Sequence, residues 1–143
     1  MPTTFDRHGI RFLYADDWNV VDDEDAGGLK TVSVESESGA LWSVSVDLSA
    51  RSPQDLLRET LATMREVYEE VEVSQFQTEV ADRPASGCEM EFFCMDLVIT
   101  ARAIAWRDGA RSVLVLSQAE SREFERKSPV FNAMLASLIR AED

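Results

Sequence analysis

The most restrictive feature of this sequence is a short apolar run that has no polar face. Residues 112–116 read SVLVL, and the dipeptide Asp108-Gly109 before them is a two-residue hairpin signal. Successive side chains of a β-strand point to opposite sides of its sheet, so a strand of this composition is buried on both sides. The sequence therefore predicts a central strand in a sheet that other elements cover on both faces.

Two segments have the apolar periodicity of helices and can supply this cover. The first begins at Ser52-Pro53, where the serine can cap the helix and the proline suits its first position, and runs to about Glu70. The same reasoning predicts a second helix from Ser128-Pro129 to about Arg140. Each has one apolar stripe, made by Leu57, Leu61, Met64, Tyr68 and Val71 in the first and by Phe131, Met134, Leu135, Leu138 and Ile139 in the second.

Alternation of apolar and polar residues predicts the other strands. It is cleanest over 41–48, where Trp42 and every second residue after it are apolar and the residues between them are polar. Segments 10–14 and 18–21 are expected to form a first hairpin around residues 15–17, and further strands are expected at 29–35, at 71–80 and over 85–106, the last broken near Met95-Asp96. Short turns between consecutive strands imply antiparallel pairing. We predict one α+β domain over 1–143, an antiparallel sheet with two amphipathic helices on its faces.

The charge of the chain bears on its partners. Asp plus Glu number 27 against 14 Lys plus Arg, so the formal net charge is −13. This charge repels phosphate backbones, and we predict no nucleic-acid partner. Arg122, Arg126 and Lys127 form the one basic group, interpreted as a solvated approach to the last helix. The first residues lack the features of a signal peptide and no apolar run approaches the ~20 residues of a membrane span, so a cytoplasmic protein without membrane insertion is expected.

Both cysteines fall in one segment that alternates like a strand. Six positions separate Cys88 from Cys94, which puts their sulfurs about 20 Å apart in a continuous strand, too far for a disulfide. Their even spacing places them on the same face as Met90 and Phe92. We therefore expect both thiols to be inert core residues.

Two stretches carry a family resemblance. Residues 9–20, GIRFLYADDWNV, resemble the N-terminal strand, turn and tryptophan strand of Mog1/PsbP-like proteins, a group that includes DcrB-like bacterial domains, and residues 129–138 resemble their final helix. Ala15 stands where a proline is frequent in that family. The resemblance implies an antiparallel sheet flanked by helices and used mainly for binding, as in a Ran-binding factor, a photosystem subunit and chaperones for secreted effectors. It implies no catalytic residue.

The residues themselves also lack a recognisable catalytic or metal-binding set. The single histidine, His8, lies in an N-terminal segment expected to be mobile, so a nucleophile has almost no candidate base. Two cysteines and one distant histidine do not make a zinc site. The acidic loop 22–25 beside Gly27-Gly28 offers oxygen ligands without the spacing of an EF-hand, and these glycines begin no phosphate-binding loop. We predict no catalytic, metal-binding or cofactor-binding residues.

These observations favour a non-catalytic module that binds another protein, as an adaptor, an assembly factor or an effector-type chaperone. The alternative is a small-molecule or lipid carrier, or an unrecognised enzyme, built around a cavity between sheet and helix. Trp18, Trp42 and Trp106 are candidates for lining such a cavity, although large aromatics in strands commonly fill the core. A third hypothesis is homo-oligomerisation through a sheet edge or a helix face.

Overall fold

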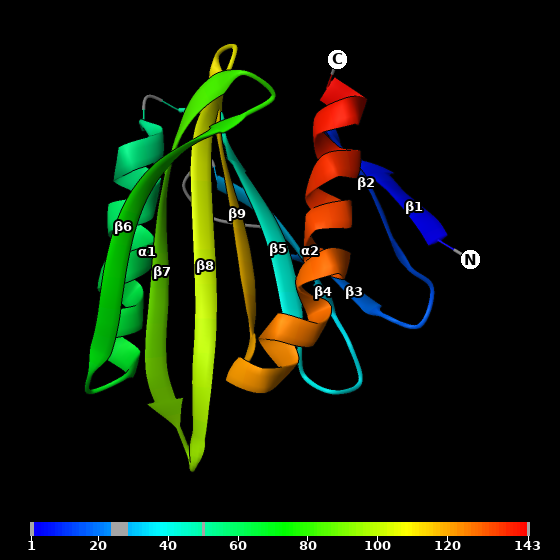
Figure 1. Ribbon diagram of the computed structural model, residues 1–143. Helices are drawn as coiled ribbons and strands as arrows, with labels where there is room; N and C mark the ends of the chain where they lie inside the picture. The colour runs from blue at the N-terminus through cyan, green and yellow to red at the C-terminus, as the bar shows by residue number, and fades with distance from the viewer. Residues whose placement is uncertain (1, 24–28, 50, 143) are drawn as a thin grey trace.

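The computed structural model describes residues 2–23, 29–49 and 51–142, which form nine strands and two helices. Seven strands make one antiparallel sheet in the order β3-β4-β5-β9-β8-β7-β6, and β1 and β2 form a separate hairpin (Figure 1). The predicted α+β fold is confirmed. The bounds are β1 (Pro2–Arg7), β2 (Ile10–Ala15), β3 (Asn19–Asp23), β4 (Leu29–Glu35), β5 (Leu41–Asp47), α1 (Pro53–Val67), β6 (Val71–Val80), β7 (Arg83–Cys94), β8 (Leu97–Asp108), β9 (Arg111–Glu120) and α2 (Ser121–Glu142).

Strand β9 occupies the centre of the sheet, between β5 and β8, as its composition predicts. Val113 and Val115 are buried on one side of it and Leu114 on the other. The turn before β9 lies one residue later than expected, because Asp108 pairs with Arg111 in the register and leaves residues 109 and 110 as the loop. The prediction of a doubly covered central strand is confirmed.

Each face of the sheet is covered by a different helix (Figure 1). On the α1 face, Ala101, Ala103 and Ala105 of β8 are fully buried, and their small side chains let the helix approach the sheet closely. On the α2 face, the helix shares the cover with the β1-β2 hairpin, whose Phe5, Ile10 and Phe12 belong to the same core cluster as Phe131 and Met134 of α2. The α1 face is thus the side of the sheet covered by α1, and the α2 face is the side covered by α2 and the hairpin.

The predicted first hairpin is wrong. Strand β2 pairs with β1, not with β3, and β3 pairs with β4 in the large sheet. The turn between β1 and β2 is His8-Gly9, both with positive φ (59° and 76°), the geometry of a two-residue hairpin. Phe5 and Phe12 pair across this hairpin with stacked rings, 5.2 Å between centroids, and bury it against α2. His8 thus lies in a defined turn instead of the mobile segment expected for it.

The predicted start of the second helix is also wrong, because α2 begins at Ser121 and contains Pro129. Ser128 does not cap the helix, and its hydroxyl donates to the carbonyl of Phe124 at 2.8 Å. Phe124 lies two turns before Phe131, the first residue of the predicted apolar stripe, and packs on it with ring centroids 5.5 Å apart. This additional packing stabilises the turns of α2 before Pro129, although the proline removes one backbone hydrogen bond of the helix.

The start of α1 is held by a network of charges and hydrogen bonds. Ser52 caps the helix, as the sequence predicts, and it forms a reciprocal capping box with Asp55. Just before it, Asp47, one of the polar residues that alternate with the apolar ones in this strand, ends β5 as a fully buried carboxylate. Asp47 forms an ion pair with Arg51 and accepts a 2.6 Å hydrogen bond from the backbone N–H of Ser49. Burial of this carboxylate is therefore compensated in the turn that leads into α1.

The substitution Asp47→Asn tests this network. Burial by itself raises the pKa of Asp47, but the hydrogen bonds from Ser49 and the charge of Arg51 outweigh it, so the pKa lies below its usual value. A lowered pKa contributes stability above about pH 4, and this is lost as the pH falls through the folded-state value. We expect Asp47→Asn to lower the free energy of unfolding by about 2 kcal/mol at pH 7, measured by urea denaturation. The variant should also lose less stability than the natural protein between pH 5 and pH 3, and equal losses would contradict the assignment.

Candidate functional site at the β6 edge and the β7–β8 hairpin

The structure does not bring the candidate nucleophiles and the histidine together. His8 belongs to the hairpin that covers the α2 face, whereas Cys88 points to the α1 face and is buried there. Burial raises the pKa of the Cys88 thiol, which keeps it protonated and unreactive at neutral pH. The expectation of an inert core thiol fits Cys88. It does not fit Cys94, which is only half-buried at the end of β7.

The other candidate residues have structural surroundings. Trp18, Trp42 and Trp106 are buried in the core cluster on the α2 face. Residues 24–28 of the acidic loop lie outside the described residues, and within the described ranges no three His, Cys, Asp or Glu side chains gather as a metal site would require. Neither helix in the part of the chain that the structure describes combines the length and the apolar character of a membrane span.

The basic group at 122–127 is balanced by neighbouring carboxylates. It lies within the first two turns of α2, which differs from the solvated approach expected before the helix. Arg122 pairs with Glu120 at 3.4 Å, and Arg126 and Lys127 both pair with Glu123, at 3.6 and 3.9 Å. The group therefore does not form an uncompensated positive patch.

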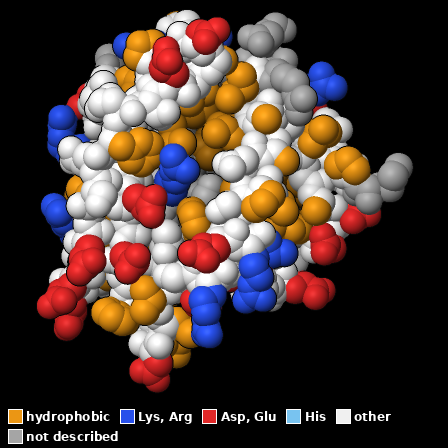
Figure 2. Space-filling view, viewed as in Figure 1, with side chains coloured by type: hydrophobic (Ala, Val, Ile, Leu, Met, Phe, Trp, Pro, Cys, Tyr) orange, Lys and Arg blue, Asp and Glu red, His pale blue; other side chains and the backbone are white. Residues whose placement is uncertain are grey.

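An apolar tip is the most exposed hydrophobic feature. Phe93, Met95 and Leu97, which we call the apolar tip, are 67%, 93% and 50% exposed at the turn between β7 and β8. This hairpin extends beyond the neighbouring strands (Figure 1), and Figure 2 shows hydrophobic side chains at that end beside acidic ones. Met95 also has a φ of 58°, a conformation that non-glycine residues seldom adopt. A large apolar side chain is thus held outward in a turn where a small polar residue would be more favourable.

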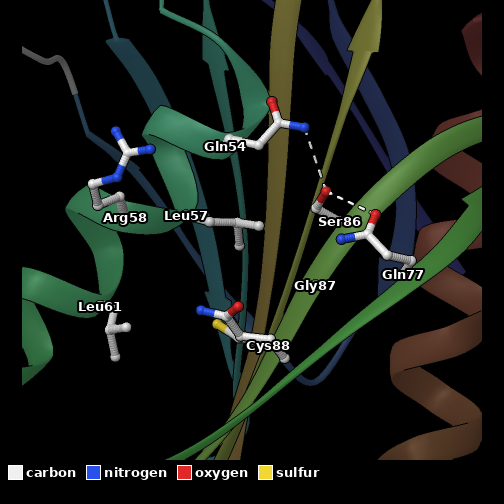
Figure 3. A pocket seen from close by; sticks show the side chains of 9 residues that line it. Gln54, Leu57, Arg58, Leu61, Gln77, Ser86, Gly87 and Cys88 are labelled. Carbon is white, nitrogen blue, oxygen red and sulfur yellow. Dashed lines mark hydrogen bonds between the residues drawn. The ribbon is translucent and has the colours of Figure 1, made fainter.

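A cleft separates α1 from the edge of the sheet (Figure 3). The hydroxyl of Ser86 donates to Gln77 Oε1 at 3.2 Å and accepts a long, 3.5 Å hydrogen bond from Gln54 of α1. Leu57 and Leu61 line the helix side below these groups, with Cys88 on the sheet side. The cleft is the cavity between sheet and helix that the alternative function requires, but its volume of about 250 Å³ is below the usual range of small-molecule sites.

The sheet edge beside this cleft is strand β6, the last in the strand order. Phe76 of β6 lies across the strand pair from Gly87 and covers it, on the α2 face, and the guanidinium of Arg102 lies 4.9 Å from the centre of the same ring. The aromatic ring thus fills the space left by the missing side chain of Gly87. Sequence reasoning identifies β6 as a strand, but which strand forms the edge depends on the pairing order of the whole sheet.

Comparison with solved structures identifies the fold. The sequence matches no protein-family profile and no curated protein. The solution structure of cyanobacterial PsbP, CyanoP, from Synechocystis superposes with a TM-score of 0.68 and 14% sequence identity over 96% of this chain and 89% of that one. The chain has the Mog1/PsbP-like fold.

Two further structures superpose less closely on this fold. LpqN of Mycobacterium tuberculosis, involved in cell envelope biogenesis, has a TM-score of 0.54 and 10% identity over 95% of this chain and 88% of that one. PA94 of Pseudomonas aeruginosa, a protein of unknown function, has a TM-score of 0.54 and 12% identity over 92% and 91%. At these identities the likeness concerns the fold alone.

The two cysteines should differ sharply in reactivity. We expect iodoacetamide to modify Cys94 in the native protein within minutes, because this residue is partly exposed at the end of a strand. Cys88 should react only after unfolding, because it is buried and burial raises the pKa of its thiol. Mass spectrometry of the intact protein and its peptides measures both. Cys94→Ser is the control and should remove the fast adduct, and modification of Cys88 at a similar rate would contradict the buried position.

Gly87→Ala tests the packing of Phe76. A Cβ at residue 87 would overlap the ring of Phe76, so we expect a loss of about 1–3 kcal/mol in the free energy of unfolding. In a Phe76→Ala background the overlap is absent, and the same substitution should cost almost nothing. Denaturant unfolding of the four proteins gives the comparison, and an equal cost in both backgrounds would show that the ring is not responsible.

Proposed function

We propose that this protein is a non-catalytic protein-binding module, of the adaptor, assembly-factor or chaperone type, that contacts its partner through the apolar tip. The observation that carries the proposal is the exposure of Phe93, Met95 and Leu97 on a hairpin that extends beyond the sheet. Full burial of one such side chain stabilises a complex by roughly 1.5–3 kcal/mol. Apolar side chains gathered at one exposed point are typical of an interaction site.

The surroundings of the tip favour a protein over a membrane as its partner. Asp96 lies in the turn itself, and Glu91, Glu70 and Glu69 are exposed nearby in β7 and before β6. Together with the net charge of −13, these carboxylates repel the anionic surface of a bilayer. A protein surface with an apolar pocket and basic residues around it complements the tip in both shape and charge.

Binding also explains the described residues better than catalysis does. The buried thiol of Cys88 and the exposed imidazole of His8 belong to opposite sides of the sheet. The cleft beside α1 is lined by amides, one hydroxyl, the guanidinium of Arg58 and a protonated thiol. These groups form hydrogen bonds, but none of them is a base that activates a nucleophile. The fold of CyanoP and LpqN provides the same sheet-and-helix scaffold, on which the function resides in the surface.

Loss of the apolar tip should abolish partner capture without affecting the fold. We expect Phe93→Ser combined with Met95→Ser to weaken capture of the partner from a lysate of the source cells at least tenfold, because two exposed apolar contacts are removed. Leu48→Ser is the matched control, since Leu48 is 74% exposed at the opposite end of the sheet. Quantitative mass spectrometry of co-purifying proteins measures the effect, and thermal unfolding checks that both variants are folded. Equal capture by the double variant and the control would refute the proposed contact surface.

A further inference from the structure

The outer edge of β6 is an unpaired strand edge ten residues long. Among the described strands only β7 pairs with β6, and the register runs without a bulge from Val71 opposite Phe92 to Val80 opposite Arg83. Exposed edges are usually protected by charged side chains, above all lysine, by proline or by a bulge, because their free N–H and C=O groups can pair with another chain. Strand β6 contains neither lysine nor proline, and its only charged residues are Glu72 and Glu79. It therefore presents a regular row of backbone donors and acceptors.

The two sides of this edge differ in chemical character. On the α1 face, Val73, Gln75 and Gln77 lie next to the cleft whose helix side is formed by Leu57 and Leu61. On the α2 face, the outward residues of the β6–β7 pair include three exposed glutamates, Glu72, Glu89 and Glu91. An extended chain added to the edge would thus meet mainly apolar and neutral polar groups on one side, with Arg58 in the wall of the cleft, and carboxylates on the other.

The glutamates are arranged in a way that favours a cation from outside. Glu72 and Glu91 are direct cross-strand partners, and Glu89 lies two residues from Glu91 on the same face. Like charges directly opposite each other destabilise a strand pair. Within the ranges that the structure describes, no ion pair joins these three carboxylates to a basic residue. They line a groove of about 460 Å³ along the edge.

The nearest arginine on this face does not neutralise them. Arg102 lies across the β7–β8 pair from Glu89, but its guanidinium lies over the ring of Phe76. The segment 66–82, which contains all of β6, carries six acidic residues and no lysine or arginine. The charge that this segment itself contributes to the edge is therefore entirely negative, and the chain that complements it is basic.

We propose that β6 binds an extended segment of the partner protein as an eighth strand, with basic side chains over Glu72, Glu89 and Glu91 and apolar side chains toward α1. This inference rests on the proposed function and specifies how the partner is bound. Backbone hydrogen bonds to β6 provide affinity, and the alternating side chains provide specificity, as in other cases of β-strand addition. The cleft beside Leu61 and Gln77 receives one of the apolar side chains.

A second copy of this chain complements the edge less well. Antiparallel pairing of two β6 strands would place two segments side by side that each carry acidic residues and no basic residue over 66–82. Their mutual repulsion opposes the dimer, whereas a basic strand from another protein relieves the repulsion already present between Glu72 and Glu91.

A synthetic peptide tests the inference without knowledge of the partner. The probe is a blocked octapeptide in which valine alternates with lysine, and its control is the same peptide with every backbone nitrogen methylated. Both carry the same charge and side chains, but only the first can donate backbone hydrogen bonds. We expect the first to bind at least tenfold more tightly by fluorescence anisotropy and to slow hydrogen exchange of the β6 amides. Equal binding of both peptides would show attraction by charge alone and would overturn strand addition, as would no binding at millimolar concentration or protection located elsewhere.

Variants of the protein locate the binding and separate this inference from the proposed function. Glu72→Gln with Glu91→Gln should weaken peptide binding at least threefold, whereas Glu37→Gln with Glu125→Gln, which removes two exposed carboxylates elsewhere, should change it less than twofold. Equal effects of the two pairs would overturn the assignment to β6.

The Phe93→Ser and Met95→Ser variant should bind the peptide normally. If that variant loses its partner in the lysate while the peptide fails to bind, the protein-binding function holds and strand addition is wrong, and the reverse pattern refutes the tip as contact surface.

Discussion

Burial of β9 on both of its faces is the constraint on which the rest of this structure depends. Val113 and Val115 contact the core on the α2 face, and Leu114 contacts the core on the α1 face. A strand with this composition is stable only if both sides of its sheet are removed from water. The fold meets this requirement asymmetrically, with α1 alone on one face and with α2 and the β1-β2 hairpin on the other.

The same constraint explains why the candidate binding surfaces lie where they do. The two helices and the β1-β2 hairpin pack over the central strands, and the alanines of β8 allow α1 to pack closely there. The sheet is wider than this cover, so β6 is left at the edge with a cleft between it and α1. The β7–β8 hairpin is likewise longer than the core requires, and it carries the apolar tip beyond the other strands. The outer edge of β6 and the apolar tip therefore lie outside the core and are available for recognition.

Two features of these surfaces lower the stability of the protein without contributing to the packing of its core. Glu72 and Glu91 face each other across a strand pair, and Met95 adopts a backbone conformation that disfavours most side chains. Such local departures from the most stable choice are common at functional sites, where the compensating interaction comes from a ligand or partner. By contrast, the buried carboxylate of Asp47 has partners within the chain, an ion pair with Arg51 and a hydrogen bond from the backbone of Ser49. This contrast between compensated interior charges and uncompensated edge charges supports a binding role for the edge.

Patterns that depend on near neighbours in the chain were sufficient for much of the fold. The central strand, the Ser52 cap and the two-sided cover follow from residue periodicity and helix-end chemistry, which act over a few residues and therefore appear in the sequence. The β1-β2 hairpin, the start of α2 at Ser121 and the edge position of β6 were decided by tertiary packing instead. The packing of Phe5, Phe12 and Phe124 against the core on the α2 face and the order of the seven strands join parts of the chain that lie far apart in the sequence, so no local pattern encodes them. The sequence by itself determined which residues must be buried, and only the tertiary structure decided which edge and which tip stay exposed, because exposure depends on where the covering elements end.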